Sequence, residues 1–285
     1  MASRRRFRGC RTEAPEWAAF FGRDEYEVDA SISPLRPAGI LDGVSTSSDL
    51  VVALDGPGSS GKSSVGAAAA LELGYRFCDT GLLYRAATWL ALQRHVRAEG
   101  AGADPKALVA LVSEIELVAD ANGRLAHVSV DGADVTEEVH TPRVDDAVSA
   151  VSRVPELRAA LLDRQRALAA EPGGIIMAGR DIGTIVLPEA DLKIFLDASV
   201  EERARRRTEE REIATDSPEA RWILAQLRRR DELDRTRSVA PLRPADDAVH
   251  IVTDGNRFED TVRAVVGEIR RAETAHSIGA GEPAR

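Results

Sequence analysis

The segment Gly56–Ser63 carries the residues with the clearest capacity for chemistry. It reads Gly-Pro-Gly-Ser-Ser-Gly-Lys-Ser and so satisfies the pattern G-x-x-x-x-G-K-S/T of a phosphate-binding loop, or P-loop. Glycines let the backbone curl until successive N–H groups converge on phosphate oxygens. We expect Lys62 to reach the β- and γ-phosphates of a nucleotide and the Ser63 hydroxyl to bind Mg²⁺. The predicted nucleotide-binding set is Gly56, Pro57, Gly58, Ser59, Ser60, Gly61, Lys62, Ser63 and Ser64.

The sequence on either side of this loop predicts the elements that would position it. The apolar run 50–54 favours a strand, and the Ala- and Leu-rich stretch 63–73 favours a helix whose N-terminal end would face the phosphates. A glycine-rich turn with a surface lysine is the competing interpretation, and both spacing and context disfavour it. The loop alone does not separate a kinase from a GTPase, an ATPase or a nucleotide-sensing regulator.

Strand and helix patterns alternate along the rest of the chain. The turn Asn122-Gly123 predicts a β-hairpin over 115–130. The alternation predicts an α/β fold with a parallel sheet covered by helices. Further helices are predicted over 82–95, 105–112, 145–152 and 156–170, and further strands over 174–178, 192–196 and 248–253.

Composition limits the classes of protein that need consideration. A chain of 285 residues with 44% hydrophobic content can bury one principal core with insertions. The net charge of −9 argues against a broad nucleic-acid-binding surface. No apolar run is long enough for a membrane span, and two cysteines without metal-ligand spacing fit a cytoplasmic protein. Residues 1–48 show no sustained periodicity, so we expect a weakly ordered N-terminal extension.

A second motif, Asp79-Thr80-Gly81-Leu82-Leu83-Tyr84-Arg85, follows one helix after the P-loop. With it, residues 50 to about 270 closely resemble the bacterial cytidylate kinase family. The resemblance continues, in the family order, at Ala147-Val148-Ser149, Pro155-Glu156-Leu157-Arg158, Gly179-Arg180-Asp181-Ile182-Gly183-Thr184, Arg230-Asp231-Glu232-Leu233-Asp234-Arg235-Thr236-Arg237 and Ala240-Pro241-Leu242.

The resemblance implies a P-loop NTPase-type three-layer fold and a monomeric enzyme. Its implied reaction is direct in-line transfer of the γ-phosphoryl group of ATP, with Mg²⁺, to CMP and dCMP. The implied kinase domain spans 49–275, followed by a flexible tail over 276–285. Within the domain, a β-containing insertion for the nucleoside monophosphate would occupy about 97–150 and a helical lid about 200–220.

The family's acceptor-binding residues map onto this sequence position by position. Thr80 and Arg85 would hold the acceptor phosphate, although a helix cap also explains Thr80. Ser149, Arg158 and Asp181 would read cytosine. Arg180 and Arg237 would face phosphates, and Arg230 and Asp234 would bind ribose hydroxyls.

The stretch 201–207 resembles the mobile lid of nucleoside monophosphate kinases. Arg203 and Arg207 lie at i and i+4, so they would share one helix face and approach the ATP phosphates, unless the helix is simply a solvated one laced by Glu–Arg pairs. The implied catalytic set is Lys62, Arg180, Arg237, Arg203 and Arg207. Ala178 departs from the acidic residue that many relatives carry before Gly-Arg-Asp, which leaves the metal ligands beyond Ser63 open.

Two other functions fit parts of this pattern. One is a P-loop kinase for UMP or another small molecule, which differs in the base-reading residues. The other is a nucleotide-binding regulator that keeps the P-loop without phosphoryl transfer, and the acceptor-side arginines disfavour it.

Overall fold

The computed structural model describes residues 49–279, so the expected N-terminal extension and residues 280–285 lie outside the described part. Its centre is an eight-stranded sheet in the order β3-β4-β2-β6-β1-β7-β8, with β5 pairing to β4. β3 and β5 run antiparallel to β4, and every other pairing is parallel, which confirms the predicted sheet. The strands are β1 Val51–Asp55, β2 Arg76–Asp79, β3 Ile115–Ala119, β4 Arg124–Val130, β5 Ala133–Asp134, β6 Ile175–Gly179, β7 Leu192–Asp197 and β8 Val249–Val252.

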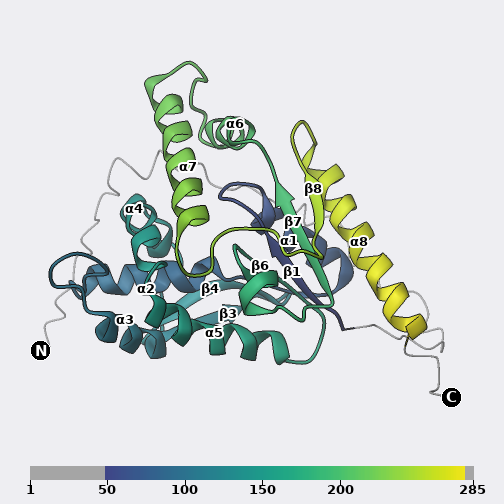
Figure 1. Cartoon of the computed structure of the whole chain (residues 1–285), viewed down its shortest axis with the longest axis horizontal. Coiled ribbons are helices and arrows are strands. Elements are labelled where there is room, and N and C mark those ends of the chain that lie inside the picture. Colours follow the sequence, from purple (N-terminus) through teal and green to yellow (C-terminus); the bar gives the residue numbers. More distant parts are fainter. Residues whose placement is uncertain (1–48, 280–285) are drawn as a thin grey trace, which may run out of the picture.

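Helices cover both faces of the sheet and complete three layers. Alternate residues of β6 point to opposite faces: Ile176 packs in a core with α1 (Lys62–Leu73) and α8 (Phe258–Gly279), and Met177 in one with α5 (Pro155–Ala170). Figure 1 shows α5 below the strands and α8, in yellow, beside β8. None of the helices within residues 49–279 combines the length and apolar composition that crossing a membrane requires.

Two further groups of helices flank the sheet at the site. α2 (Gly81–Gln93), α3 (Pro105–Leu111) and α4 (Pro142–Val151) share a core with β3 and β4. α6 (Val200–Glu210) and α7 (Pro218–Thr236) pack on each other through a small apolar cluster and rise above the sheet in green in Figure 1.

Local sequence explains where α6 and α7 begin. The Ser199 hydroxyl accepts the Glu202 N–H at 3.2 Å, and the Ser217 hydroxyl accepts the Ala220 N–H at 3.0 Å, so serine N-caps open both α6 and α7. Proline follows Ser217 at the first helical position, where its missing N–H costs nothing.

The structure departs from the sequence expectations in several places. β2 was not predicted, because only two apolar residues stand between Arg76 and Asp79. The hairpin expected inside an insertion instead continues the central sheet, since β4 pairs parallel with β2. α4 begins at Pro142 rather than at 145, and residues 276–279, expected to belong to the tail, continue α8. Short 3₁₀ turns at 112–114 and 138–140 and a π-helical turn at 182–186 were not anticipated either.

Candidate active site

The predicted site residues gather at one edge of the sheet. The carboxyl ends of β1, β2, β6 and β7 meet there because these strands are parallel. The loop after β1 is the P-loop, β2 leads into Thr80, β6 into Arg180, and β7 into α6. Ligands of open α/β sheets bind at this edge, so the topology brings four separate segments of sequence to one place.

The P-loop takes a conformation that depends on its glycines. A Cβ at Gly56 would lie 2.2 Å from the carbonyl oxygen of Leu196, so the loop can pass β7 only without a side chain there. Gly61 has φ of +88°, and Ser59 also lies in the left-handed region with φ of +59°. α1 begins at Lys62, directly after the loop, as the motif predicts.

Lys62 and Ser63 point into the loop and the neighbouring strand end. Lys62 Nζ donates to the Pro57 carbonyl at 2.9 Å, and burial, with Arg180 next in importance, lowers the pKa of Lys62 well below its usual value. A bound polyphosphate would supply the counter-charge that this buried amine lacks. Ser63 Oγ donates to Asp79 Oδ2 at 2.5 Å. Ser60 Oγ is buried with no hydrogen-bond partner among residues 49–279, whereas Ser64 Oγ donates to Gly61 O at 3.1 Å.

A pocket beside the P-loop, called the acceptor pocket below, contains every residue predicted to bind CMP. The side chains that line it come from α2, α4, α5, α7 and the loop after β6. The predicted residues among them are Thr80, Arg85, Ser149, Arg158, Arg180, Asp181, Arg230, Asp234 and Arg237.

The phosphate-binding candidates Thr80 and Arg85 flank the start of α2. Thr80 stands at the N-cap position, but its hydroxyl donates to the Ala178 carbonyl at 2.9 Å and makes no capping bond, so the helix-cap interpretation of its side chain is wrong. Arg85 donates to the Val139 carbonyl at 3.1 Å and to Asp145 at 2.5 Å. Ser149 lines the acceptor pocket and the larger cavity beside it.

The base-reading candidates Arg158 and Asp181 form a buried ion pair. Asp181 is 4% exposed and accepts hydrogen bonds from Arg158 and, at 3.3 Å, from Arg237. The Arg158 guanidinium also lies over the Tyr84 ring, 5.2 Å from its centroid, in a cation–π contact. Arg237 donates to the Ala240 carbonyl as well. The three charged groups therefore hold each other in place before any ligand arrives.

Positive charge dominates the side of the pocket that faces the P-loop. Arg180 Nε donates to Asp234 Oδ2 at 3.0 Å, and although burial would raise the pKa of Asp234, Arg180 and Arg230 hold it below its usual value. Arg230 makes no hydrogen bond or ion pair within the described residues. Burial, followed by Arg180, lowers the pKa of Arg230 to about 10. The N–H donors of this guanidinium are therefore available to oxygen atoms of a ligand.

The two arginines predicted to lie in a lid, Arg203 and Arg207, make different contacts. Arg207 donates to Ser59 Oγ of the P-loop at 3.2 Å, as expected of a group that approaches ATP. Arg203 is 2% exposed and bonds to Ala198 O, Gly58 O and both carboxylate oxygens of Asp231. These four contacts fix the guanidinium against Gly58, so Arg203 supports the P-loop. Its approach to the ATP phosphates stays a prediction.

Asp55, at the end of β1, ties the loop after β6 to the P-loop strand. Its two carboxylate oxygens accept the N–H groups of Ile182 and Gly183, both at 2.8 Å. Burial raises the pKa of Asp55 to about 6, although these hydrogen bonds lower it in part. The position of Arg180 and Asp181 therefore depends on a buried carboxyl group.

This raised pKa predicts a pH dependence of stability. The unperturbed pKa is 3.8, so between about pH 4 and pH 6 the folded chain binds a proton more tightly than the unfolded chain does. The contribution of Asp55 to the free energy of unfolding should fall as the pH rises through this window and stay constant above it. Urea unfolding of the wild type and of Asp55→Asn at several pH values measures the difference, and a difference that rises with pH would contradict the assignment.

Sequence reasoning did not assign several residues that the structure brings to the site. Asp79 and Tyr84 lie inside the motif 79–85 and line the acceptor pocket, so their segment was found but not their roles. Asp231 lies inside the motif 230–237 but received no role, and Asp145 lies in no motif; their partners are 28 and 60 residues away in the chain.

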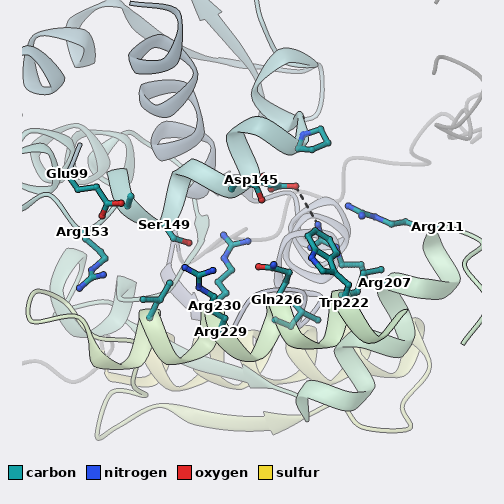
Figure 2. Close-up of a pocket in the computed structure, with 16 residues that line it drawn as sticks. Glu99, Asp145, Ser149, Arg153, Arg207, Arg211, Trp222, Gln226, Arg229 and Arg230 are labelled. Carbon is teal, nitrogen blue, oxygen red and sulfur yellow. Dashed lines mark ion pairs between the residues drawn. The ribbon is translucent and has the colours of Figure 1, made fainter. Parts of the chain in front are cut away.

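A larger cavity adjoins the acceptor pocket and is called the outer cavity below. It lies between α4 and α7, and Figure 2 shows Arg229, Arg230 and Gln226 projecting into it from α7. Ser149 and Arg230 line both cavities, so the two cavities are direct neighbours.

A P-loop next to a second, cation-lined pocket is typical of P-loop kinases that act on small phosphorylated acceptors. The sequence model of the family described as cytidylate kinase matches residues 52–271. The cytidylate kinase of Nocardia farcinica is 43% identical over 238 residues, which cover 84% of this chain and 99% of that protein. That of Rhodococcus opacus is 45% identical over 217 residues, covering 76% and 93%. The chain therefore belongs to the cytidylate kinase family, and its activity is ATP-dependent phosphorylation of CMP.

Proposed function

We propose that the protein transfers the γ-phosphoryl group of ATP directly to CMP and dCMP, giving CDP and dCDP. The observation that carries this proposal is the acceptor pocket, where nine residues from five parts of the chain meet beside Lys62. An oxygen of the acceptor phosphate attacks the γ-phosphorus, and the bond to the oxygen bridging the β- and γ-phosphates breaks to release ADP. The attacking oxygen is already ionised at neutral pH, so no general base is required.

Each side of the site contributes charge and position. Donor phosphates would lie on the P-loop N–H groups with Lys62, and Arg207 would reach them from the lid. The acceptor phosphate would lie against Thr80 and Arg85. Arg180 and Arg237 would neutralise charge near the transferred group, which is where phosphoryl transfer gains most from a protein.

The base and the sugar have separate binding groups in this proposal. Asp181 and Arg158 offer an acceptor and a donor fork to the polar edge of cytosine, with Ser149 beside them. Arg230 and Asp234 would bind the ribose hydroxyls. A buried polar group left unpaired by the wrong base costs about 1–3 kcal/mol, which corresponds to roughly tenfold discrimination or more.

The residues beside the P-loop suit Mg²⁺. The Ser63 hydroxyl and the Asp79 carboxylate are hard oxygen donors in direct contact, and Mg²⁺ in kinases takes few protein ligands besides phosphates and water. We propose that these two residues hold the ion, with Asp79 supplying the carboxylate that Ala178 cannot. When bound, Mg²⁺ neutralises phosphate charge. The monomeric state and the cytoplasmic location stay predictions.

A panel of acceptors tests this function. With ATP and Mg²⁺, ADP formation should be fastest with CMP and dCMP and at least about tenfold slower with UMP and AMP, because Arg158 and Asp181 would pair with cytosine and be left unpaired by another base. A UMP preference would support the kinase alternative. ATP binding without acceptor-dependent ADP formation would support a regulator, and equal rates with all four acceptors would refute the base-reading roles.

A further inference from the structure

Asp145 of α4 lies between the acceptor side and the lid, and the proposed function gives it no role. Its Oδ1 accepts a hydrogen bond from Nη2 of Arg85 at 2.5 Å, and its Oδ2 lies 3.6 Å from Nη2 of Arg207. Figure 2 shows this second pairing across the outer cavity. One carboxylate therefore contacts an arginine of α2 and an arginine of α6.

Arg85 and Arg207 each make a further hydrogen bond beyond Asp145. Arg85 Nη1 donates to the Val139 carbonyl at 3.1 Å, which fixes the guanidinium on the acceptor side. Arg207 Nη1 donates to Ser59 Oγ at 3.2 Å, which carries the connection into the P-loop. Direct contacts thus run from the proposed acceptor-phosphate site through α4 and the lid to the donor loop.

Asp145 contacts Arg85 from a side that does not compete with the acceptor phosphate. Asp145 lines the outer cavity but not the acceptor pocket, whereas Arg85 lines the acceptor pocket but not the outer cavity. The carboxylate therefore meets Arg85 from outside the pocket and leaves its pocket side to a ligand. The Arg85, Asp145 and Arg207 side chains are only 18%, 23% and 24% exposed, so their charges are less screened than those of a surface pair.

We propose that Asp145 is a positioning residue that couples acceptor binding to the placement of Arg207 on the donor phosphates. This inference rests on the proposed phosphate-binding roles of Arg85 and Arg207. Without the carboxylate, the guanidinium groups of Arg85 and Arg207 would repel each other. No contact would then link the orientation of Arg207 on α6 to that of Arg85 on α2. With the carboxylate in place, each nucleotide should bind more tightly when the other is present. Binding of either nucleotide would order the contact of Arg85, Asp145 and Arg207, which the second nucleotide also needs.

The substitution Asp145→Asn tests the proposal, because it keeps the size of the side chain and one acceptor oxygen but removes the charge. Asp146→Asn is the matched control: Asp146 is the next residue of α4, exposed, and without an ion pair among residues 49–279. Titration calorimetry would give the affinity for CMP with and without a non-hydrolysable ATP analogue. Asp145→Asn should lower kcat about tenfold and remove most of the mutual tightening, whereas the control should stay within about twofold of wild type.

A double-mutant cycle separates positioning from general support of the fold. If Asp145 acts through Arg207, then Asp145→Asn should lower kcat by less than about twofold in the Arg207→Ala background. A full tenfold effect there, or mutual tightening that survives Asp145→Asn, would overturn the proposal. So would tighter CMP binding with unchanged kcat, which is the result expected of a competitor for Arg85. Near wild-type activity of both Arg85→Ala and Arg207→Ala would instead refute the phosphate-binding roles on which the inference rests.

Discussion

Lys62→Met should lower kcat for CMP phosphorylation by about a thousandfold, the largest effect expected of any single substitution in this chain. Methionine has a similar length but no charge, so the change removes the cation that would follow the γ-phosphoryl group to the acceptor. Lys62 is buried beside Arg180 and Arg230, and the charge of these neighbours remains in the variant. The loss should therefore appear in kcat more than in the KM for CMP. Steady-state kinetics with ATP and CMP measure both constants.

Lys106→Met provides the matched control for this experiment. Lys106 lies exposed on α3, away from both cavities, and should keep wild-type kinetics. The thermal unfolding midpoint of Lys62→Met should not fall, because the wild-type chain holds a buried amine at a cost. A Lys62→Met variant with kcat within tenfold of wild type would contradict the assigned role.

Asp181→Asn should lower kcat/KM for CMP by about 10²- to 10³-fold, since breaking a buried pair costs about 3–5 kcal/mol and part of that cost falls on binding. The substitution removes the charge that pairs Arg158 with Arg237, so two buried guanidinium groups are left close together. An asparagine amide would also present a donor where cytosine offers its own amine. The ratio of kcat/KM for CMP to that for UMP should therefore fall.

The control for this second prediction is Asp163→Asn. Asp163 is exposed on α5, the helix that carries Arg158, and its neutralisation should change neither kcat/KM nor the CMP to UMP ratio. Thermal unfolding of Asp181→Asn separates lost recognition from lost folding. If the folded variant keeps both kcat/KM and the ratio, Asp181 does not read the base.

The grouping of the candidate acceptor residues in one pocket was predictable because they lie in short motifs whose order carries over from the family. Thr80 and Arg85 share one motif, and Arg230, Asp234 and Arg237 share another. Identifying each motif therefore assigned several residues at once. All of them line the acceptor pocket. The sheet was predictable for a similar reason, since buried parallel strands such as β6 are continuous apolar runs.

Residues whose partners lie far away in the chain were not predictable in the same way. The i, i+4 spacing of Arg203 and Arg207 places them near one face of α6, but it does not say what that face meets. In the fold, Arg203 is enclosed by Asp231 and the Gly58 carbonyl, while Arg207, one turn later, reaches Ser59. Asp145 is a further example, because its proposed role depends on contacts with two arginines of other helices, Arg85 and Arg207.

The order of the strands also limits when the site can form during synthesis. β1 is the first strand of the sheet to emerge from the ribosome and leads into the P-loop, yet its neighbours in the sheet are β6 and β7, residues 175–179 and 192–197. Such long-range pairing has a high entropic cost of loop closure and slows folding. A nascent chain that ends before β7 lacks one neighbour of β1 and the Leu196 carbonyl against which Gly56 packs. Nucleotide binding should therefore appear late in translation, after most of the acceptor side has already been made.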